Sequence, residues 1–373
     1  MLKNLAAFFL GLFAALLLAE VLLRVWSPVE IRVRGDRILL PYHAVYEFRQ
    51  AEVPGLDTQI RHTKNSLGFR GPEPDALPQD VPRIITVGGS TTEGFYLSDG
   101  RDWPAVMASS LEAAGHEVWV NNAAMDGHST IGHLVLLEDY LLSLQPDFIL
   151  VKAGLNDIGR SDSHERRIRS GLRFSSPADF IRSASYYSET VATLLHLYRM
   201  YLAGDAGIRH QFLDLKQQPV LDAIDREEAD RAVAWHAHYF TDAYRTRLSR
   251  FVEMSLESGI TPVLITQAIL AGAGTDPVTG VDLAKLLYRG GSGYQLWRVL
   301  ELYNDVTREV ADAYDIPLID LAGTMEKSSE YFYDMFHFSN AGAAVAGTII
   351  ANGMSEVLTD TAALQQQSGT ALP

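Results

Sequence analysis

The sequence predicts an α/β domain on a doubly wound, parallel five-stranded sheet, with a helical insertion and an N-terminal transmembrane helix. Short runs rich in β-branched residues indicate buried strands at residues 83–87, 117–123, 148–152, 261–266 and 317–321. Apolar residues recur at helical spacing at residues 103–114, 130–144, 294–313 and 340–358. Strands that alternate with helices indicate a parallel sheet covered on both faces.

The first 26 residues predict the transmembrane helix. Residues 5–19 are all apolar, and the apolar run resumes after Glu20 and continues to Trp26, which is long enough to span a bilayer. A cleavable signal peptide is the main alternative, but it needs a small-x-small site and Leu17 precedes Ala19. A buried core helix is a further alternative, although core helices are rarely apolar on every face. We therefore expect an uncleaved membrane anchor over residues 1–26.

The rest of the chain divides into three parts by composition and hydrophobic pattern. Residues 27–80 indicate a linker or small N-terminal extension with a strand or two. Residues 81–358 form the main domain, and residues 158–258 within it have helical texture without a clear strand, which we interpret as the insertion. Residues 359–373 are polar, and we expect a flexible tail.

Composition excludes several classes of function. The chain of 373 residues has 47% hydrophobic and 21% charged residues, which is typical of a globular protein. Its net charge of −15 repels phosphate backbones, so we expect no nucleic-acid partner. The absence of cysteine excludes disulfides, thiolate zinc sites and a cysteine nucleophile, and leaves the redox compartment open.

Polar and glycine residues follow the predicted strands, and the carboxyl ends of parallel strands meet at one edge of a sheet. The first strand leads to Gly88-Gly89-Ser90, the second to Gly127, the third to Gly154-Leu155-Asn156-Asp157, and the fifth, after a loop, to Asp334-Met335-Phe336-His337. Each fragment alone is weak, since a Gly-Ser turn is usually a helix cap and Asp-x-x-His is common by chance. Their order, each after a strand, is the stronger signal.

This set suits acyl transfer. Ser90 would attack, His337 would take its proton, and Asp334 would orient the imidazole. The N–H of Ser90, the N–H of Gly127 and the side-chain amide of Asn156 would hold the oxyanion.

The four fragments resemble the blocks of the SGNH, or GDSL-type, hydrolases. The resemblance covers about residues 83–357 and implies a flavodoxin-like sheet, a Ser90–His337–Asp334 triad and an oxyanion hole from Ser90, Gly127 and Asn156. Gly89 stands where the name-giving motif has Asp, which we expect to change local support rather than chemistry.

The resemblance and the charges around the anchor conflict on sidedness. Lys3 alone precedes the span, whereas four arginines lie at its end or beyond it, which favours a cytoplasmic domain: Arg24, Arg32, Arg34 and Arg37. Anchored members similar to this chain usually place the domain outside the cytoplasm. We expect the single-pass, extracytoplasmic (periplasmic) arrangement.

Other candidates have plainer interpretations. His128 and His133 suit a polar loop or helix face, and their spacing with Asp126 and Asp157 matches no metal motif, so we expect no metal and no cofactor. Gln267 would lie near the site or cap its strand. The basic stretch at residues 164–173 suits a solvated face or anionic headgroups. The tyrosines of the middle segment suit packing, with a lid or carbohydrate-stacking role as the alternative: Tyr186, Tyr187, Tyr198 and Tyr201.

We therefore predict a membrane-anchored serine ester hydrolase that acts through an acyl-serine on O-acyl groups of envelope glycans or on lipid esters. One alternative is an O-acetyltransferase that uses the same triad. Another is a catalytically silent binding or scaffold protein, against which the intact set of residues argues.

Overall fold

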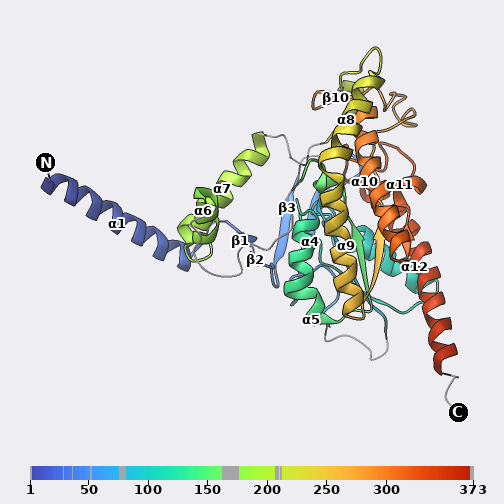
Figure 1. Ribbon diagram of the computed structural model, residues 1–373, viewed down its shortest axis with the longest axis horizontal. Coiled ribbons are helices and arrows are strands. Elements are labelled where there is room, and N and C mark those ends of the chain that lie inside the picture. Colours follow the sequence, from blue (N-terminus) through green and yellow to red (C-terminus); the bar gives the residue numbers. More distant parts are fainter. Residues whose placement is uncertain are drawn as a thin grey trace. The chain divides into compact units, whose positions relative to one another are not determined.

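The computed structural model describes residues 2–27, 29–35, 37–50, 53–74, 81–161, 176–205, 210 and 212–369. The chain forms two compact units (Figure 1). The first, here called the helical unit, combines residues 1–41 with residues 165–209. The second, here called the sheet unit, combines residues 42–164 with residues 210–373.

The sheet unit contains a parallel five-stranded sheet in the order β11-β8-β7-β5-β6, as the sequence predicts. The strands are β5 (Arg83–Gly88), β6 (Trp119–Asn122), β7 (Phe148–Lys152), β8 (Thr261–Ile265) and β11 (Leu318–Ile319). Strand β7 is buried along its whole length, which is typical of a parallel sheet covered on both faces. In register, Gly88 at the end of β5 pairs with Lys152 at the end of β7, so these two strands end side by side.

Right-handed crossovers place the main helices on opposite faces of the sheet. The chain steps outward from β5 to β6 through α3 (Trp103–Ala113) and then back to β7 through α4 (Thr130–Leu136), so α3 and α4 lie on different faces. The steps to β8 and β11 continue in the second direction, through α9 (Thr241–Glu257) and α10 (Gly293–Ala313). Accordingly α9 packs against α4 and α10, while the final helix α12 (Asn340–Gly369) packs against α3.

Shorter elements connect these layers. Residues 130–144 form one continuous helical segment, in which a π-helical turn (Leu137–Leu141) joins α4 to α5 (Leu142–Leu144). The remaining short pieces of the sheet unit are α2 (Ser90–Glu93), two 3₁₀ turns (Leu155–Asp157 and Leu215–Gln217), β9 (Leu287–Tyr288), β10 (Gly291–Ser292) and α11 (Leu321–Thr324). Two of them, α2 and the turn at Leu155–Asp157, follow directly after the strands β5 and β7.

Residues 158–258 do not behave as one insertion. Helices α6 (Pro177–Ala184) and α7 (Glu189–Asp205) belong to the helical unit, whereas α8 (Arg226–Tyr239) and α9 belong to the sheet unit. Helix α9 buries Tyr244, Leu248 and Phe251 completely, so it is one of the helices that cover the sheet. The sequence pattern shows only helical texture here, which is the same for an inserted helix and a sheet-covering one.

The predicted linker and tail also differ from the structure. The sheet unit begins near residue 42, and its hairpin of β3 (Val45–Arg49) and β4 (Gln59–Thr63) falls within the expected linker at residues 27–80. The hairpin of β1 (Val33–Arg34) and β2 (Arg37–Ile38) belongs to the helical unit. Helix α12 continues to Gly369 where we expected a flexible tail from residue 359, because this stretch is rich in the helix formers Ala, Leu and Gln.

Two described helices are long and apolar enough to cross a membrane. Helix α1 (Leu2–Val25) contains the first candidate, Lys3–Val25, whose most apolar window has a mean hydropathy of 2.5 and is not buried at all. The second candidate, Asn340–Ala363, has a lower hydropathy, is 44% buried and packs against α3, as a core helix does. The apolar N-terminal helix is therefore a candidate anchor or signal sequence.

Candidate active site

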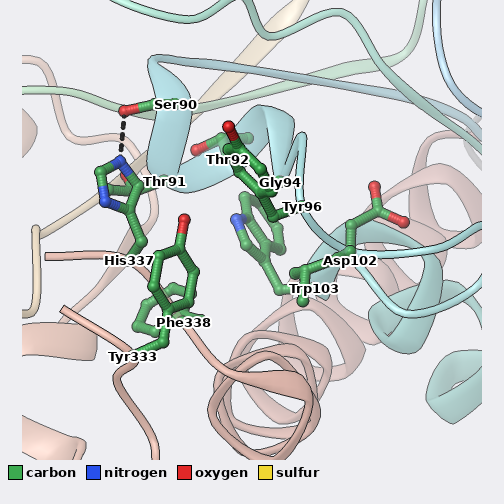
Figure 2. A pocket seen from close by; sticks show the side chains of 11 residues that line it. Ser90, Thr91, Thr92, Gly94, Tyr96, Asp102, Trp103, Tyr333, His337 and Phe338 are labelled. Atoms are coloured by element: carbon green, nitrogen blue, oxygen red, sulfur yellow. Dashed lines mark hydrogen bonds between the residues drawn. The ribbon is translucent and has the colours of Figure 1, made fainter. Parts of the chain in front are cut away.

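Ser90 begins helix α2 directly after strand β5. Gly89 is the residue before the helix, and Gly94 ends it in the left-handed conformation that favours glycine (φ 60°). A Cβ atom on Gly88 would lie 2.3 Å from Thr92 Oγ1, so the strand can turn this sharply into the helix only without a side chain there. The turn leaves the Ser90 hydroxyl pointing out of the sheet edge toward His337 (Figure 2).

Ser90, His337 and Asp334 form one hydrogen-bonded relay. The Nε2 atom of His337 lies 2.8 Å from Ser90 Oγ, and its Nδ1 atom lies 2.7 Å from Asp334 Oδ2 (Figure 2 draws the first bond). A carboxylate only accepts hydrogen bonds, so Nδ1 carries the proton and Nε2 is free to accept the serine proton. The predicted nucleophile, base and orienting carboxylate thus meet at the edge of the sheet.

A short loop holds the histidine and the aspartate together. The backbone N–H groups of Phe336 and His337 donate to Asp334 Oδ1 at 2.8 and 2.7 Å, and Phe332 pairs with Phe338 across the base of the loop. Burial raises the pKa of Asp334, but the charge of His337 and these hydrogen bonds outweigh it and hold the pKa below its usual range. Asp334 therefore stays ionised while it orients His337.

The three predicted oxyanion donors lie around the same turn. The N–H of Met125 donates to Gly88 O at 3.2 Å, and the amide of Asn156 donates to His128 O at 2.9 Å, so residues 125–128 lie between the serine turn and Asn156. Gly127 has φ 71°, the left-handed value that the third residue of a type II turn requires. The Asn156 amide has two N–H donors, so the bond to His128 leaves one for an oxyanion.

A small cavity adjoins Ser90. Its free volume is about 10 Å³, which is room for about one water molecule. Side chains from α2, the start of α3 and the His337 loop line it: Ser90, Thr91, Thr92, Gly94, Tyr96, Leu97, Asp102, Trp103, Tyr333, His337 and Phe338 (Figure 2). The aromatic lining and the narrow space leave little room for a bulky group beside Ser90.

With this geometry in place, comparison with known proteins decides the family. The model of the GDSL-like lipase/acylhydrolase family matches residues 86–345, more than half of the chain. The chain belongs to this family. The resemblance predicted from the four short blocks is confirmed, and with it the class of enzyme, an ester-cleaving acylhydrolase.

Individual relatives are more distant. An arylesterase from Vibrio mimicus is 28% identical over 82 residues, which are 22% of this chain and 41% of that protein, so the match spans less than half of the relative. A lipase/acylhydrolase from Enterococcus faecalis has 18% identity and a TM-score of 0.41, covering 74% of this chain and 96% of its own. An acetylxylan esterase from Geobacillus stearothermophilus has 14% identity and a TM-score of 0.40, covering 73% and 92%.

Buried ionic groups hold together the segments that carry the site residues of this acylhydrolase. The carboxylate of Asp157 accepts from the N–H and hydroxyl of Thr130 and from Arg247 at 3.0 Å, and both Asp157 and Arg247 are fully buried. Asp157 thereby links helix α9 to the start of α4 and to the turn that carries Asn156. The sequence pattern alone does not indicate this role for Asp157.

A second buried pair holds the two other oxyanion segments. Lys64 and Glu93 form an ion pair of 3.1 Å with almost no exposed surface, and Glu93 also accepts the N–H of Asp126, the residue before Gly127. Arg70 donates to the carbonyls of Glu93 and Gly94 at 2.8 and 2.7 Å, clamping the end of α2. The expected linker therefore contributes directly to the site of this acylhydrolase.

Lys152 lies beneath the serine helix. Its ammonium donates to Thr91 O at 3.0 Å and lies 4.5 Å from the centre of the Phe338 ring. Burial lowers the pKa of Lys152 well below its usual range. No spacing pattern marks this lysine in the sequence, where it reads only as the end of a buried strand.

His210 is a further residue at the site that sequence reasoning missed. Its ring lies 4.1 Å from the His337 ring, its Nδ1 lies 2.7 Å from the Tyr333 hydroxyl, and its Nε2 lies 3.4 Å from Asp126. Burial lowers the pKa of His210, but the hydrogen bond and charge of Asp126 outweigh it and hold the pKa above its usual range. His210 is bonded to Asp126 and Tyr333, which come from distant segments of the chain, so its own sequence neighbours do not indicate this role.

The other sequence candidates take structural positions. His133 is buried on α4, which lowers its pKa to about 4, so it is a core residue rather than a polar face. Gln267 is buried and accepts from the Thr91 hydroxyl at 3.2 Å. Asp157 forms an ion pair with Arg247 and does not form a metal-ligand cluster with Asp126. Among the described residues, the ligand atoms of His210, Asp334 and His337 lie within 4.8 Å of one another, but His337 and Asp334 already belong to the relay. The basic stretch at residues 164–173 lies outside the described residues.

Proposed function

We propose that this acylhydrolase is a serine esterase in which Ser90 attacks, His337 transfers the proton and Asp334 orients His337. The single observation that carries the proposal is the relay from Ser90 Oγ through both ring nitrogens of His337 to Asp334. Nucleophile, base and orienter in hydrogen-bond reach are the minimum that this chemistry requires.

The reaction follows from the positions of the protons. Ser90 Oγ bonds to the ester carbonyl carbon as its proton passes to His337 Nε2, while the Nδ1 proton stays in its bond to Asp334. The tetrahedral intermediate collapses when Nε2 returns that proton to the departing alkoxide, which leaves as the alcohol. Water then attacks the acyl-serine by the same route, and the carboxylic acid leaves as the serine proton is restored.

The N–H groups of Ser90 and Gly127 and the amide of Asn156 supply the oxyanion donors in this proposal. They come from three separate strand ends that packing has already fixed, so they need not reorganise as charge develops. Removing one such donor typically costs about 10²- to 10³-fold in kcat.

The substrate that fits best is an ester with a short acyl chain. The pocket beside Ser90 is narrow and is lined by Trp103, Tyr333 and Phe338, which favours acetyl over a fatty acyl chain. With an N-terminal anchor, O-acetyl groups on an envelope glycan are the natural substrate class, and short-chain lipid esters are the second.

The test is hydrolysis of p-nitrophenyl and phenyl esters of increasing chain length by the full chain in detergent. Ser90→Ala should lower kcat by about 10⁴-fold or more, leaving only the effects of binding and the oxyanion donors. Ser110→Ala, a serine on α3 away from the site, is the matched control and should keep full activity. A fluorophosphonate probe should label the wild type and not Ser90→Ala. Equal hydrolysis by both proteins would remove Ser90 as nucleophile, and absence of both hydrolysis and labelling in the wild type would favour the silent scaffold.

An O-acetyltransferase is the second candidate, because the same acyl-serine can react with a sugar hydroxyl instead of water. Product analysis with an acetyl donor and a glycan acceptor separates the two. Acetate as the main product supports the esterase, and acetylated glycan as the main product supports the transferase.

We propose further that α1 is an uncleaved anchor and that the sheet unit lies outside the cytoplasm. The exposed, apolar span supports the anchor, and family resemblance supports the side. Alkaline phosphatase fused to the C-terminus should be active and a fluorescent protein that folds only in the cytoplasm should be dark. The reverse result would place the domain inside, as the arginine count favours.

A further inference from the structure

Helices α6 and α7 of the helical unit have an inverted distribution of side chains. Small or polar residues are buried in it: Ser183, Ser185, Ala192 and Thr193. Large apolar and aromatic residues of α6, α7 and the turn between them are 40–69% exposed: Phe180, Ile181, Tyr187, Leu194, Leu197, Tyr198, Met200 and Tyr201. In water-soluble proteins large apolar side chains prefer the interior, whereas small residues mark helix contacts inside membranes.

The first turn of α7 is bonded to the membrane-spanning helix. Glu20 of α1 accepts the N–H groups of Glu189 and Thr190 at 3.0 Å each, and the hydroxyls of Ser188 and Thr190 at 2.7 and 3.0 Å. Arg24, one turn later on α1, donates to Tyr187 O at 2.9 Å. The start of α7 therefore lies at the same depth as Glu20.

That depth is inside the edge of the bilayer core. The candidate span Lys3–Val25 has 23 residues, or about 35 Å at 1.5 Å per residue, against a hydrocarbon core of about 30 Å. Glu20 precedes the end of the span by five residues, about 8 Å, so it falls a few Å within the hydrocarbon edge. A carboxylate there needs internal partners, and α7 supplies them.

Other charged groups near this junction are also paired within the helical unit. Arg24 bonds to Glu20 at 2.9 Å, Arg34 pairs with Glu189, and the guanidinium of Arg37 lies 4.9 Å from the centre of the Tyr186 ring. Internal pairing of charges, with apolar groups turned outward, is the pattern that a surrounding of low dielectric constant favours.

We propose that α6 and α7 lie in the interface of the bilayer that α1 spans, with their exposed apolar side chains in contact with lipid. The partner is a phospholipid bilayer at the boundary of headgroups and acyl chains, where Tyr and Trp side chains are favoured. The protein is then attached to the membrane by a spanning helix and an interfacial pair of helices together.

The absence of cysteine allows a direct test in the full chain. Single cysteines at Leu194 and Tyr198 carry a nitrobenzoxadiazole label, and the labelled chain is reconstituted into phosphatidylcholine vesicles. Nitroxide groups on the lipid acyl chains should quench both labels at least half as strongly as a label on Leu10→Cys, in the middle of α1. Aqueous iodide should quench them several-fold less than a label on Glu112→Cys, an exposed position of α3.

Three results would overturn the proposal. Labels on α7 that iodide quenches as strongly as the label on Glu112→Cys would place α7 in water. Labels shielded from both lipid and iodide would mean that protein, either the sheet unit or a second copy, covers this face. A label at Leu10 that lipid fails to quench would remove the span on which the proposal depends. Unchanged circular dichroism of each labelled chain excludes misfolding, and none of these readouts depends on esterase activity.

Discussion

At the scale of single residues, Gly89 brings the serine turn against Asn156. A Cβ atom on Gly89 would lie 2.3 Å from Asn156 Nδ2 and 3.1 Å from His128 O. This explains why the chain departs from the name-giving motif at this position, since no side chain fits there. The sequence analysis expects this departure to change local support rather than chemistry, and the side chain that lies against Gly89 is that of Asn156.

Gly89→Ala should therefore act through Asn156. The added methyl group displaces the amide from the oxyanion, and we expect kcat to fall by about tenfold to 100-fold with a small change in KM. Asn156→Ala should lower kcat by about 10²-fold or more. In the Asn156→Ala background Gly89→Ala should cost little more, because the clash is gone. Steady-state kinetics of the four proteins measures this, and additive losses would contradict the link.

His210 should determine the pH profile. Because its pKa is raised, His210 is mostly cationic at pH 6, and it loses this charge as the pH rises through the raised pKa. The cationic His210 ring offsets the negative charge of Asp126 beside the His337 ring, whose centre lies 4.1 Å away. His210→Gln removes that charge only where it exists. We expect kcat/KM to fall by about two- to fivefold at pH 6 and by less at pH 8.5, an estimate in line with about 1 kcal/mol between charges at this separation in water.

The control for this prediction is Tyr333→Phe, which removes the hydroxyl bonded to His210 but no charge. Its profile should keep the shape of the wild type. A loss in His210→Gln that is equal at all pH values would reduce His210 to a packing role.

At the scale of elements, buried ion pairs fix the strand ends. Arg247 of α9 is the cation paired with the buried Asp157, and both side chains are 0–1% exposed. Arg247→Met leaves that carboxylate without its cation, and we expect about 3–5 kcal/mol of lost stability. Arg245→Met is the matched control, since Arg245 lies two residues away on the same helix and its ion pair with Glu309 is exposed. Its loss should lower the stability by under about 1 kcal/mol. Thermal and urea unfolding measure both, and equal losses would contradict the prediction.

The elements also show what a sequence can predict. The strands and Ser90, Gly127, Asn156, Asp334 and His337 follow from local patterns, because each lies at a strand end or in a short loop. Helix α9 could not be assigned to the sheet, since its apolar spacing is the same as that of an inserted helix. His210 and Lys152 could not be placed, because their roles depend on burial and on partners more than 50 residues away.

At the scale of the molecule, each unit combines two distant segments of the chain. Residues 165–209 leave the sheet unit and return to it, and in between they complete the helical unit around α1. The two units differ in which of their side chains are exposed. The sheet unit contains most of the buried apolar residues, whereas α6 and α7 of the helical unit expose many of their large apolar side chains. In our proposal the chain thus combines an acylhydrolase unit with a helical unit that contacts lipid.

The net charge of −15 should act on substrates before they reach the site. An acidic protein repels anionic esters and attracts cationic ones, and salt screens both effects. We expect kcat/KM for 4-acetoxybenzoate to rise about two- to threefold between 20 and 200 mM NaCl, as the Debye length falls from about 20 to about 7 Å. The neutral 4-acetoxybenzamide, of matched shape, should change little, and a trimethylammonium analogue should slow. An anionic ester whose rate does not respond to salt would show that His210 and the backbone donors near Ser90 outweigh the net charge at the site.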